Sequence, residues 1–311
     1  MSKNWNGSTG AFRNGDNWSP SGAPAAGDDL TIAAGLAKLR HGSFGSADAT
    51  TAIHLTGDAS DPAGLTVANA TLKNVRIDEV TGVPGDYAAR TGTLVIKGQV
   101  VNDGGAFVAD GNVPVNHVLN IEMRPGATLV NEGTIGADPG ASLNVDGSDA
   151  AGLENDGTIS AVGGTVTVSA HLTGTGDLYA AEGRLLGGSI ELKGAVDAGQ
   201  TVHLNRGGVQ VDAPDQFLGS VDLPAVSGGL SLEGLDAASW ASDGNLLELF
   251  NASGALADTV RLTPQANPVD LKVSAFTDPT YGQGVSITAV PPGFPSNIAG
   301  ALPQQDFVSM A

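Results

Sequence analysis

Leu129-Val-Asn-Glu-Gly-Thr-Ile135 and Leu153-Glu-Asn-Asp-Gly-Thr-Ile159 are two copies of one phrase, and Val100-Val-Asn-Asp-Gly104 is a shorter third copy. The asparagine of the phrase stands at positions 102, 131 and 155. A repeat period between about 20 and 50 residues is typical of solenoid proteins, which stack one structural unit on the next. Because Asn and Gly tolerate the left-handed backbone of a sharp corner, we interpret each copy as a corner. The chain is therefore predicted to coil, with one such corner in each lap.

Short strands with alternating apolar and polar residues surround these copies. They fall at 30–32, 52–55, 65–67, 71–77, 93–96, 118–121, 142–145, 165–168, 189–192, 202–204, 209–211 and 230–232. Alternation sends every second side chain to one face, which is the interior of a β-helix. Hairpin-built sandwiches or barrels also contain such strands, but the likeness of one lap to the next favours stacking, with Leu129 over Leu153 and Ile135 over Ile159. At 20 to 25 residues a lap and ~4.8 Å between strands, about 200 residues make roughly nine laps.

Composition favours the same architecture and excludes several partners. The 311 residues include 45 Gly and 16 Pro, and only 15% are charged, so long amphipathic helices are not expected. A formal net charge of -19 should repel nucleic acid and anionic lipid. No apolar run approaches the length of a membrane-spanning helix. We therefore expect one elongated body, with no nucleic acid as partner and no membrane span.

The chain contains no cysteine, so neither a disulfide nor a thiolate metal site is available. Carboxylates in the acidic turns are therefore the candidate metal ligands. Asp146, Asp149 and Asp156 are weak candidates for calcium, which prefers oxygen ligands. The alternative is that these carboxylates are simply solvated turns that keep the protein soluble. The calcium-binding nonapeptide Gly-Gly-x-Gly-x-Asp is absent.

Residues 1–29 are predicted to form an N-terminal cap. Trp5 and Trp18 stand in a segment otherwise made of turn-forming residues. A solenoid needs a lid, because its first lap would otherwise expose apolar side chains and strand edges. The alternative interpretation of the two tryptophans is a platform on which sugars stack.

The same segment carries a family resemblance. Trp5-Asn-Gly7, Asn17-Trp18 and the Pro-x-x-Gly-Asp-Asp of residues 24–29 resemble the opening of many bacterial secreted and surface proteins with parallel β-helices. The Asn-x-Gly-Thr-Ile laps are similar to those of autotransporter and filamentous-haemagglutinin-type adhesins. The resemblance implies an all-β parallel β-helix, here predicted over residues 30–235, in an extracellular or cell-surface bacterial protein.

The C-terminal part has a different sequence pattern from the repeated laps. Residues 236–290 are predicted to form a small β region, with a hairpin in Asn245–Leu256 and further strands at 271–275 and 284–289. This region resembles hairpins near the C-termini of bacterial proteins exported by type I secretion. Residues 291–311 form a proline-rich tail in which Phe294 and Phe307 are candidates for capping or assembly. The tail is interpreted as an uncleaved export signal, with a disordered end or an arm that adds to a neighbouring subunit as alternatives.

Export by a route other than Sec is expected, because the chain starts without a recognisable signal peptide. No catalytic constellation stands out: the five histidines are scattered, and neither Gly-x-Ser-x-Gly nor His-Glu-x-x-His occurs. The sequence therefore predicts a non-enzymatic extracellular structural protein, such as an adhesin or a subunit of a surface or biofilm-matrix filament. It would assemble with itself through its ends, faces or tail, and cell-surface or matrix polysaccharide is a further candidate partner. A β-helical polysaccharide lyase, epimerase or hydrolase is the first alternative, and a phage tailspike or fibre domain is the second.

Overall fold

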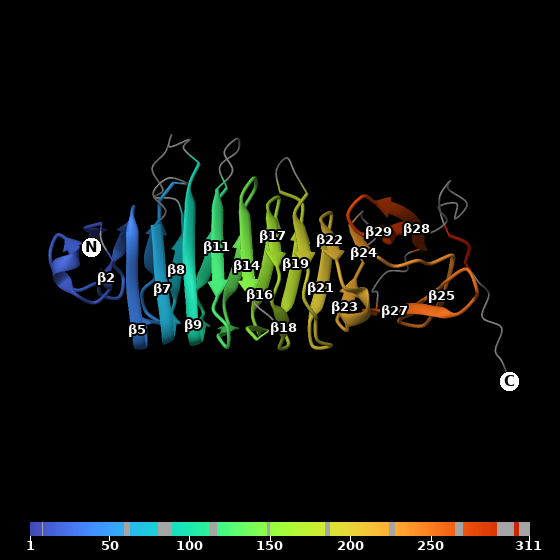
Figure 1. Ribbon diagram of the computed structural model, residues 1–311, viewed down its shortest axis with the longest axis horizontal. Coiled ribbons are helices and arrows are strands. Elements are labelled where there is room, and N and C mark those ends of the chain that lie inside the picture. Colours follow the sequence, from blue (N-terminus) through green and yellow to red (C-terminus); the bar gives the residue numbers. More distant parts are fainter. Residues whose placement is uncertain are drawn as a thin grey trace.

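The chain winds into a parallel β-helix in the computed structural model (Figure 1). The structure describes residues 1–7, 9–58, 63–79, 89–111, 117–147, 150–183, 187–223, 228–264, 270–290 and 302–304. The expected all-β solenoid is confirmed, since long parallel sheets dominate and the only helices in these ranges are the short 3-10 turns η1 (Gly15–Asn17) and η2 (Pro214–Gln216). No helix in the described ranges is both long and apolar enough to cross a membrane.

The first sheet has 14 strands, and most of them are parallel. In chain order they are β1 (Ser2–Trp5), β3 (Trp18–Ser19), β4 (Asp29–Ile32), β6 (Thr51–Leu55), β8 (Val75–Asp78), β10 (Ala106–Ala109), β13 (Thr134–Ala137), β16 (Thr158–Val162), β19 (Asp177–Ala181), β21 (Thr201–Asn205), β23 (Ser220–Asp222), β25 (Ser239–Asp243), β26 (Leu246–Phe250) and β27 (Leu256–Leu262). Strands in neighbouring laps lie side by side along the rod (Figure 1).

The second sheet has 15 strands and forms the other faces of the coil. They are β2 (Gly10–Ala11), β5 (Gly35–Gly45), β7 (Ala63–Lys73), β9 (Thr91–Asp103), β11 (Val118–Met123), β12 (Thr128–Asn131), β14 (Ser142–Gly147), β15 (Gly152–Asn155), β17 (Thr165–Val168), β18 (His171–Thr173), β20 (Ser189–Leu192), β22 (Gly208–Val211), β24 (Gly229–Glu233), β28 (Asp270–Asp278) and β29 (Gly282–Val290). The first part of β9 pairs with β11 and its second part with β12. The next three laps therefore use two short strands, β11 and β12, β14 and β15, and β17 and β18, where β5, β7 and β9 use one long strand.

Equivalent residues stack in the interior as the repeat predicts. Leu129 pairs with Leu153 and Ile135 with Ile159, and all four side chains are fully buried. One hydrophobic cluster runs from the N-terminal cap to the C-terminal strands. Burial of stacked apolar side chains on every lap is the main source of stability for such a coil.

The repeated asparagines have a different role from the one predicted. Asn102, Asn131 and Asn155 lie at strand ends with ordinary backbone angles and are fully buried, so the expectation of left-handed corners at these residues is wrong. Each side-chain amide donates to the next one, at 2.8 Å from Asn102 to Asn131 and at 2.8 Å from Asn131 to Asn155. Asn155 in turn donates to Gln200 at 2.9 Å. The phrase therefore encodes an internal amide ladder that links successive laps.

The glycines of the phrase allow the laps to approach closely. Only Gly104 has a positive φ, at 67°, whereas Gly133 and Gly157 do not. A Cβ at Gly157 would lie 2.2 Å from the carbonyl oxygen of Gly133, and a Cβ at Gly133 would lie 2.2 Å from that of Gly105. Glycine is required in this column because any side chain would collide with the backbone of the preceding lap.

Gly157→Ala should lower the free energy of unfolding by about 2 kcal/mol, because the methyl group forces apart two laps that are held by ladder hydrogen bonds. Gly152→Ala is the matched control, since a Cβ there meets nothing within 4 Å. Urea unfolding followed by circular dichroism measures both. Equal stability of the two variants would contradict a close-packed glycine column.

Aromatic rings fill the N-terminal end of the coil. Trp5 and Trp18 are buried, with ring centroids 5.2 Å apart in an edge-to-face arrangement, and Phe12 and Phe44 continue the cluster. The indole nitrogen of Trp18 donates to the carbonyl oxygen of Phe12 at 2.7 Å. Since both tryptophans are below a tenth exposed, their rings are not presented to solvent as a sugar platform.

Antiparallel strands close the opposite end. The strands β25, β26 and β27 form an antiparallel group; β29 pairs antiparallel with the last coil strand β24, and β28 pairs antiparallel with β29. The tail segment Leu302–Gln304 packs against them: Trp240 donates through its indole nitrogen to the carbonyl oxygen of Leu302, at 3.1 Å, and Leu302 donates its amide to Val273, at 2.7 Å. This part of the tail therefore covers the chain's own end.

Candidate functional site

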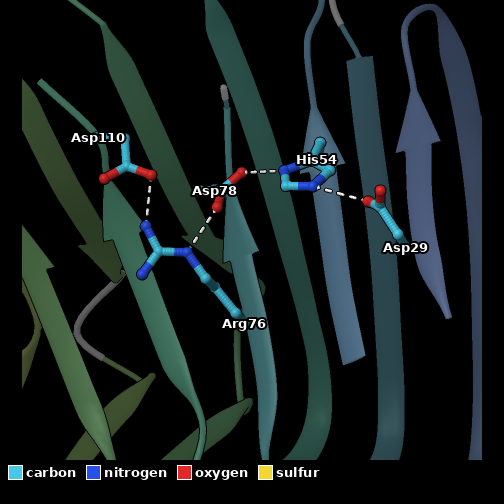
Figure 2. Close-up of polar contacts among 5 residues, drawn as sticks. All are labelled: Asp29, His54, Arg76, Asp78 and Asp110. Atoms are coloured by element: carbon cyan, nitrogen blue, oxygen red, sulfur yellow. Dashed lines mark hydrogen bonds and ion pairs between the residues drawn. The ribbon is translucent and has the colours of Figure 1, made fainter. Parts of the chain in front are cut away.

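A row of charged side chains crosses the outer face of the first sheet (Figure 2). Asp29 is on β4, His54 on β6, Arg76 and Asp78 on β8, and Asp110 follows β10. In these strands the intervening residues point inward, so the charged ones alternate to the outside. Parallel pairing then sets His54 directly beside Asp78. The coil thus brings together residues from four separate laps.

Each member of this row bonds to the next. The Nε2 atom of His54 lies 2.9 Å from Oδ1 of Asp29, and its Nδ1 atom lies 2.5 Å from Oδ1 of Asp78. The Nε atom of Arg76 donates to the other oxygen of Asp78 at 2.7 Å, and its terminal nitrogen pairs with Asp110. Charge-assisted bonds of this kind are stronger than neutral ones. We call these five residues the His54 ladder.

The ladder favours a charged imidazole. Burial alone lowers the pKa of His54, but the hydrogen bond and negative charge of Asp78, together with Asp29, outweigh it and raise the pKa above the ordinary value of 6.5. The pKa of Arg76 is raised as well, because Asp110 and Asp78 outweigh the effect of burial. Two carboxylates therefore flank one imidazolium, which balances part of the negative surface.

His54→Gln should destabilise the protein by about 1 to 2 kcal/mol at pH 5.5 and by less at pH 9. The folded-state pKa is raised, so the stabilisation by protonated His54 is fully present below 6.5 and is lost as pH rises through the folded pKa. Unfolding curves at the two pH values, with an NMR titration of the imidazole, measure the effect. A His54 pKa at or below 6.5 would contradict the prediction.

A proton-sharing carboxylate pair continues the row. Ala109 pairs with Ala137, which places Asp138 in the lap beside Asp110. Burial raises the pKa of Asp138 to about 6, and its hydrogen bond to Asp110 and the charge of Asp110 add to that effect, whereas Arg76 opposes it. Two neighbouring carboxylates that share a proton can donate or accept it near neutral pH.

Glu79 lies next to the ladder but in the interior. Its side chain is fully buried, and within the described residues no side chain donates a hydrogen bond to its carboxyl oxygens; backbone hydrogen bonds at Glu79 and Asp110 lower its pKa, but by less than burial raises it. Burial raises the pKa of Glu79 to about 9, and the charge of Asp78 adds to the shift. The group is therefore a neutral carboxylic acid at pH 7.

The same arrangement occurs a second time near the other end of the first sheet. His203 on β21 contacts Asp177 on β19 at 3.0 Å and Asp222 on β23 at 3.2 Å. In both places the first aspartate is the opening residue of the neighbouring strand in the preceding lap. The second aspartate pairs directly with the histidine from the following lap. Here Tyr179 also stacks on the imidazole, with ring centroids 4.4 Å apart. The geometry Asp-His-Asp is thus a repeated feature of this face.

The residues proposed from sequence do not form one site. Asp146 is exposed on β14, and one oxygen of Asp156 accepts hydrogen bonds from the backbone amide and hydroxyl of Thr175. Asp149, Phe294 and Phe307 lie outside the described residues. In the described parts of the chain, no group of three or more His, Asp or Glu side chains is placed to hold a metal ion.

Sequence reasoning missed both histidine ladders. His54 is 25 and 24 positions from its two aspartates, whereas His203 is 26 and 19 positions from its own, so unequal laps obscure the pattern. The usable signal was local: Asp-Leu opens the first strand in both cases, His-Leu stands in the second, and an apolar residue precedes Asp in the third. Alignment of strands by lap would have revealed it.

No protein-family model matches the chain. No curated protein matches it either.

Proposed function

We propose that this chain is an extracellular structural protein of a bacterium, either an adhesin or a subunit of a surface or biofilm-matrix filament. One observation carries the proposal: a continuous stacked interior is closed at both ends by the chain's own segments. The extended surfaces left for contact are the lateral faces of the rod. A rigid rod with such faces suits adhesion or lateral assembly.

Closure of the ends changes the expected mode of assembly. The outermost strand of the first sheet, β25, is bridged by Gln304 of the tail, and β3 pairs antiparallel at the other end. Addition of strands end to end would require removal of these segments, whereas contact through the lateral faces would not. We therefore assign self-association and polysaccharide contact to the lateral faces.

Fractionation of producing cells, followed by immunogold labelling of intact cells, tests the proposal. The protein should appear in the medium or on the cell surface, and deletion of its gene should reduce attachment or matrix formation. Protein confined to the cytoplasm, with unchanged attachment after deletion, would overturn the assignment.

A carbohydrate-active enzyme is the second candidate, and one specific observation favours it. The pKa of Asp138 is raised to about 6, so this carboxyl group can exchange a proton near neutral pH, as a general acid or base in glycan cleavage does. Incubation with alginate and pectin, followed by reducing-end and unsaturated-product assays, separates the two functions. Turnover that Asp138→Asn abolishes would establish the enzyme, and no turnover would leave the structural function as the one supported.

A further inference from the structure

Charge is divided unequally along one lateral face. The outward side chains of the first parts of β5, β7 and β9, together with those of β11, β14, β17, β20, β22 and β24, form what we call the charged face, which runs the length of the rod. Its N-terminal half carries Lys38 and Arg40 on β5 and Lys97 on β9; Arg124 directly follows β11 and pairs with Glu122 at 3.1 Å, and Arg13 lies beside Lys38 and Arg40. The whole chain has only 14 Lys and Arg against 33 Asp and Glu. Five of the 14 cations therefore gather on or beside half of one face.

Three of these cations surround a cavity and have no acidic partner. Arg13, Lys38 and Arg40 line a cavity of about 410 Å³, with Gly10 and Ala11. Arg13 donates to the carbonyl oxygen of Ser43 at 2.6 Å, which fixes its guanidinium. Ion pairs hold Lys73, Arg76, Arg124, Lys193 and Arg206, whereas Arg13, Lys38 and Arg40 make none within the described residues. Neighbouring like charges repel each other, so an external carboxylate would relieve the repulsion.

The C-terminal half of the charged face is acidic. Glu191 points outward from β20, Asp212 directly follows β22, and Asp278 ends β28 beyond them, while Asp146 is on β14 in the middle of the face. Burial raises the pKa of the nearby Glu233, and the charges of Asp278 and Asp212 raise it further, which reflects the local excess of negative charge. The two cations here are Lys193, paired with Glu191 at 3.2 Å, and Lys272.

We propose that two copies of this chain pair through their charged faces in antiparallel orientation, so that the basic half of each copy meets the acidic half of the other. With the two-fold axis at β14, the fifth of the nine strands, β5 faces β24 and β9 faces β20. Lys38 and Arg40 then lie against the carboxylates around β22 and β28, and Lys97 lies against Glu191. The contact is isologous and closes as a dimer. This inference rests on the proposed structural function and specifies its mode of assembly.

The available area fits a modest dimer. Nine strands at ~4.8 Å spacing, each of about four to six residues at ~3.3 Å, give a face of roughly 40 by 15 to 20 Å, or about 600 to 800 Å² per copy. Stable interfaces bury about 800 Å² per partner. At 0.1 M salt the Debye length is about 10 Å. Salt therefore weakens the long-range repulsion between two acidic rods more than it weakens the close contacts between opposite charges. Association is therefore expected at 0.1 M NaCl and should be lost at 1 M.

A charge exchange tests the orientation. One variant combines Arg40→Glu with Lys97→Glu and removes the excess of positive charge from the N-terminal half, and a second combines Glu191→Lys with Asp212→Lys and removes the excess of negative charge from the C-terminal half. Light scattering after size exclusion should give twice the 30.9 kDa mass for the wild type and single-chain mass for each variant alone. An equal mixture of the two variants should recover the dimer, because both basic-acidic contacts are restored in the mixed pair.

Controls separate this pairing from a general charge effect. Lys73→Glu with Arg206→Glu changes the net charge equally, but these residues pair with Asp103 and Glu182 away from the charged face, so this variant should remain dimeric. Circular dichroism melting verifies that each variant folds. A monomeric wild type at 0.1 M NaCl, a series of masses above the dimer, or no recovery in the mixture would overturn the antiparallel pairing. Surface labelling of cells is independent of these outcomes and continues to test the structural function itself.

Discussion

Asn131→Ala should lower the free energy of unfolding by about 4 kcal/mol. Asn131 is the central member of the amide ladder: it accepts from Asn102 and donates to Asn155, both at 2.8 Å, and all three are fully buried. Truncation leaves one buried donor and one buried acceptor without their partners, each costing about 1 to 3 kcal/mol, and adds a small cavity. Two neighbouring laps are therefore weakened by one substitution.

Asn144→Ala is the matched control for the amide ladder. Asn144 donates to Asn120 at 2.9 Å in the same kind of lap-to-lap contact, but on the half-exposed outer surface. Water replaces the lost partner there, so the cost should stay below about 1 kcal/mol. Denaturant unfolding of both variants at pH 7 measures the difference. Similar losses for Asn131→Ala and Asn144→Ala would contradict the special role of the buried ladder.

Glu79→Met should stabilise the protein by about 3 kcal/mol at pH 7. The folded pKa of about 9 lies above the ordinary value of 4.5, so the folded chain keeps a proton that the unfolded chain releases. The stability present below pH 4.5 is lost at about 1.4 kcal/mol per pH unit as pH rises towards 9. Methionine has a similar volume and no charge to bury, and it removes this loss.

The pH dependence distinguishes this effect from ordinary repacking. The difference in unfolding free energy between Glu79→Met and the wild type should be close to zero at pH 4.5 and should grow at pH 7 and pH 8.5. Glu132→Met, at an exposed position, should change stability little at any of these pH values. A stabilisation of Glu79→Met that does not vary with pH would show that the carboxyl group is not held in its neutral form.

Sequence patterns specified the coil better than the site. Repetition of Leu-x-Asn-acid-Gly-Thr-Ile fixed the stacking of Leu129 on Leu153, because equal residues in equal laps satisfy the same interior. The role of Asn131 could not be deduced in the same way, since asparagine suits both a left-handed corner and a buried amide stack. Only the pairing of laps shows which role applies.

The different roles of Asp78 and Glu79 could not be predicted from the sequence for a related reason. Asp78 and Glu79 are adjacent in a chain with many carboxylates, and nothing in the pair marks one as an outer ion-pair partner and the other as a buried acid. Strand alternation makes this distinction, since Asp78 points outward to His54 and the next residue turns inward. The two histidine ladders likewise depend on lap lengths that differ by several residues.

The direction of the lap-to-lap hydrogen bonds has a mechanical consequence. These hydrogen bonds run along the rod. A stretching force applied between the two capped ends therefore breaks them sequentially, one lap at a time, and does not shear many of them together. A freed lap of about 24 residues extends to roughly 80 Å, against the ~4.8 Å that it occupied. A tether of this kind yields at low tension and lengthens greatly before it breaks.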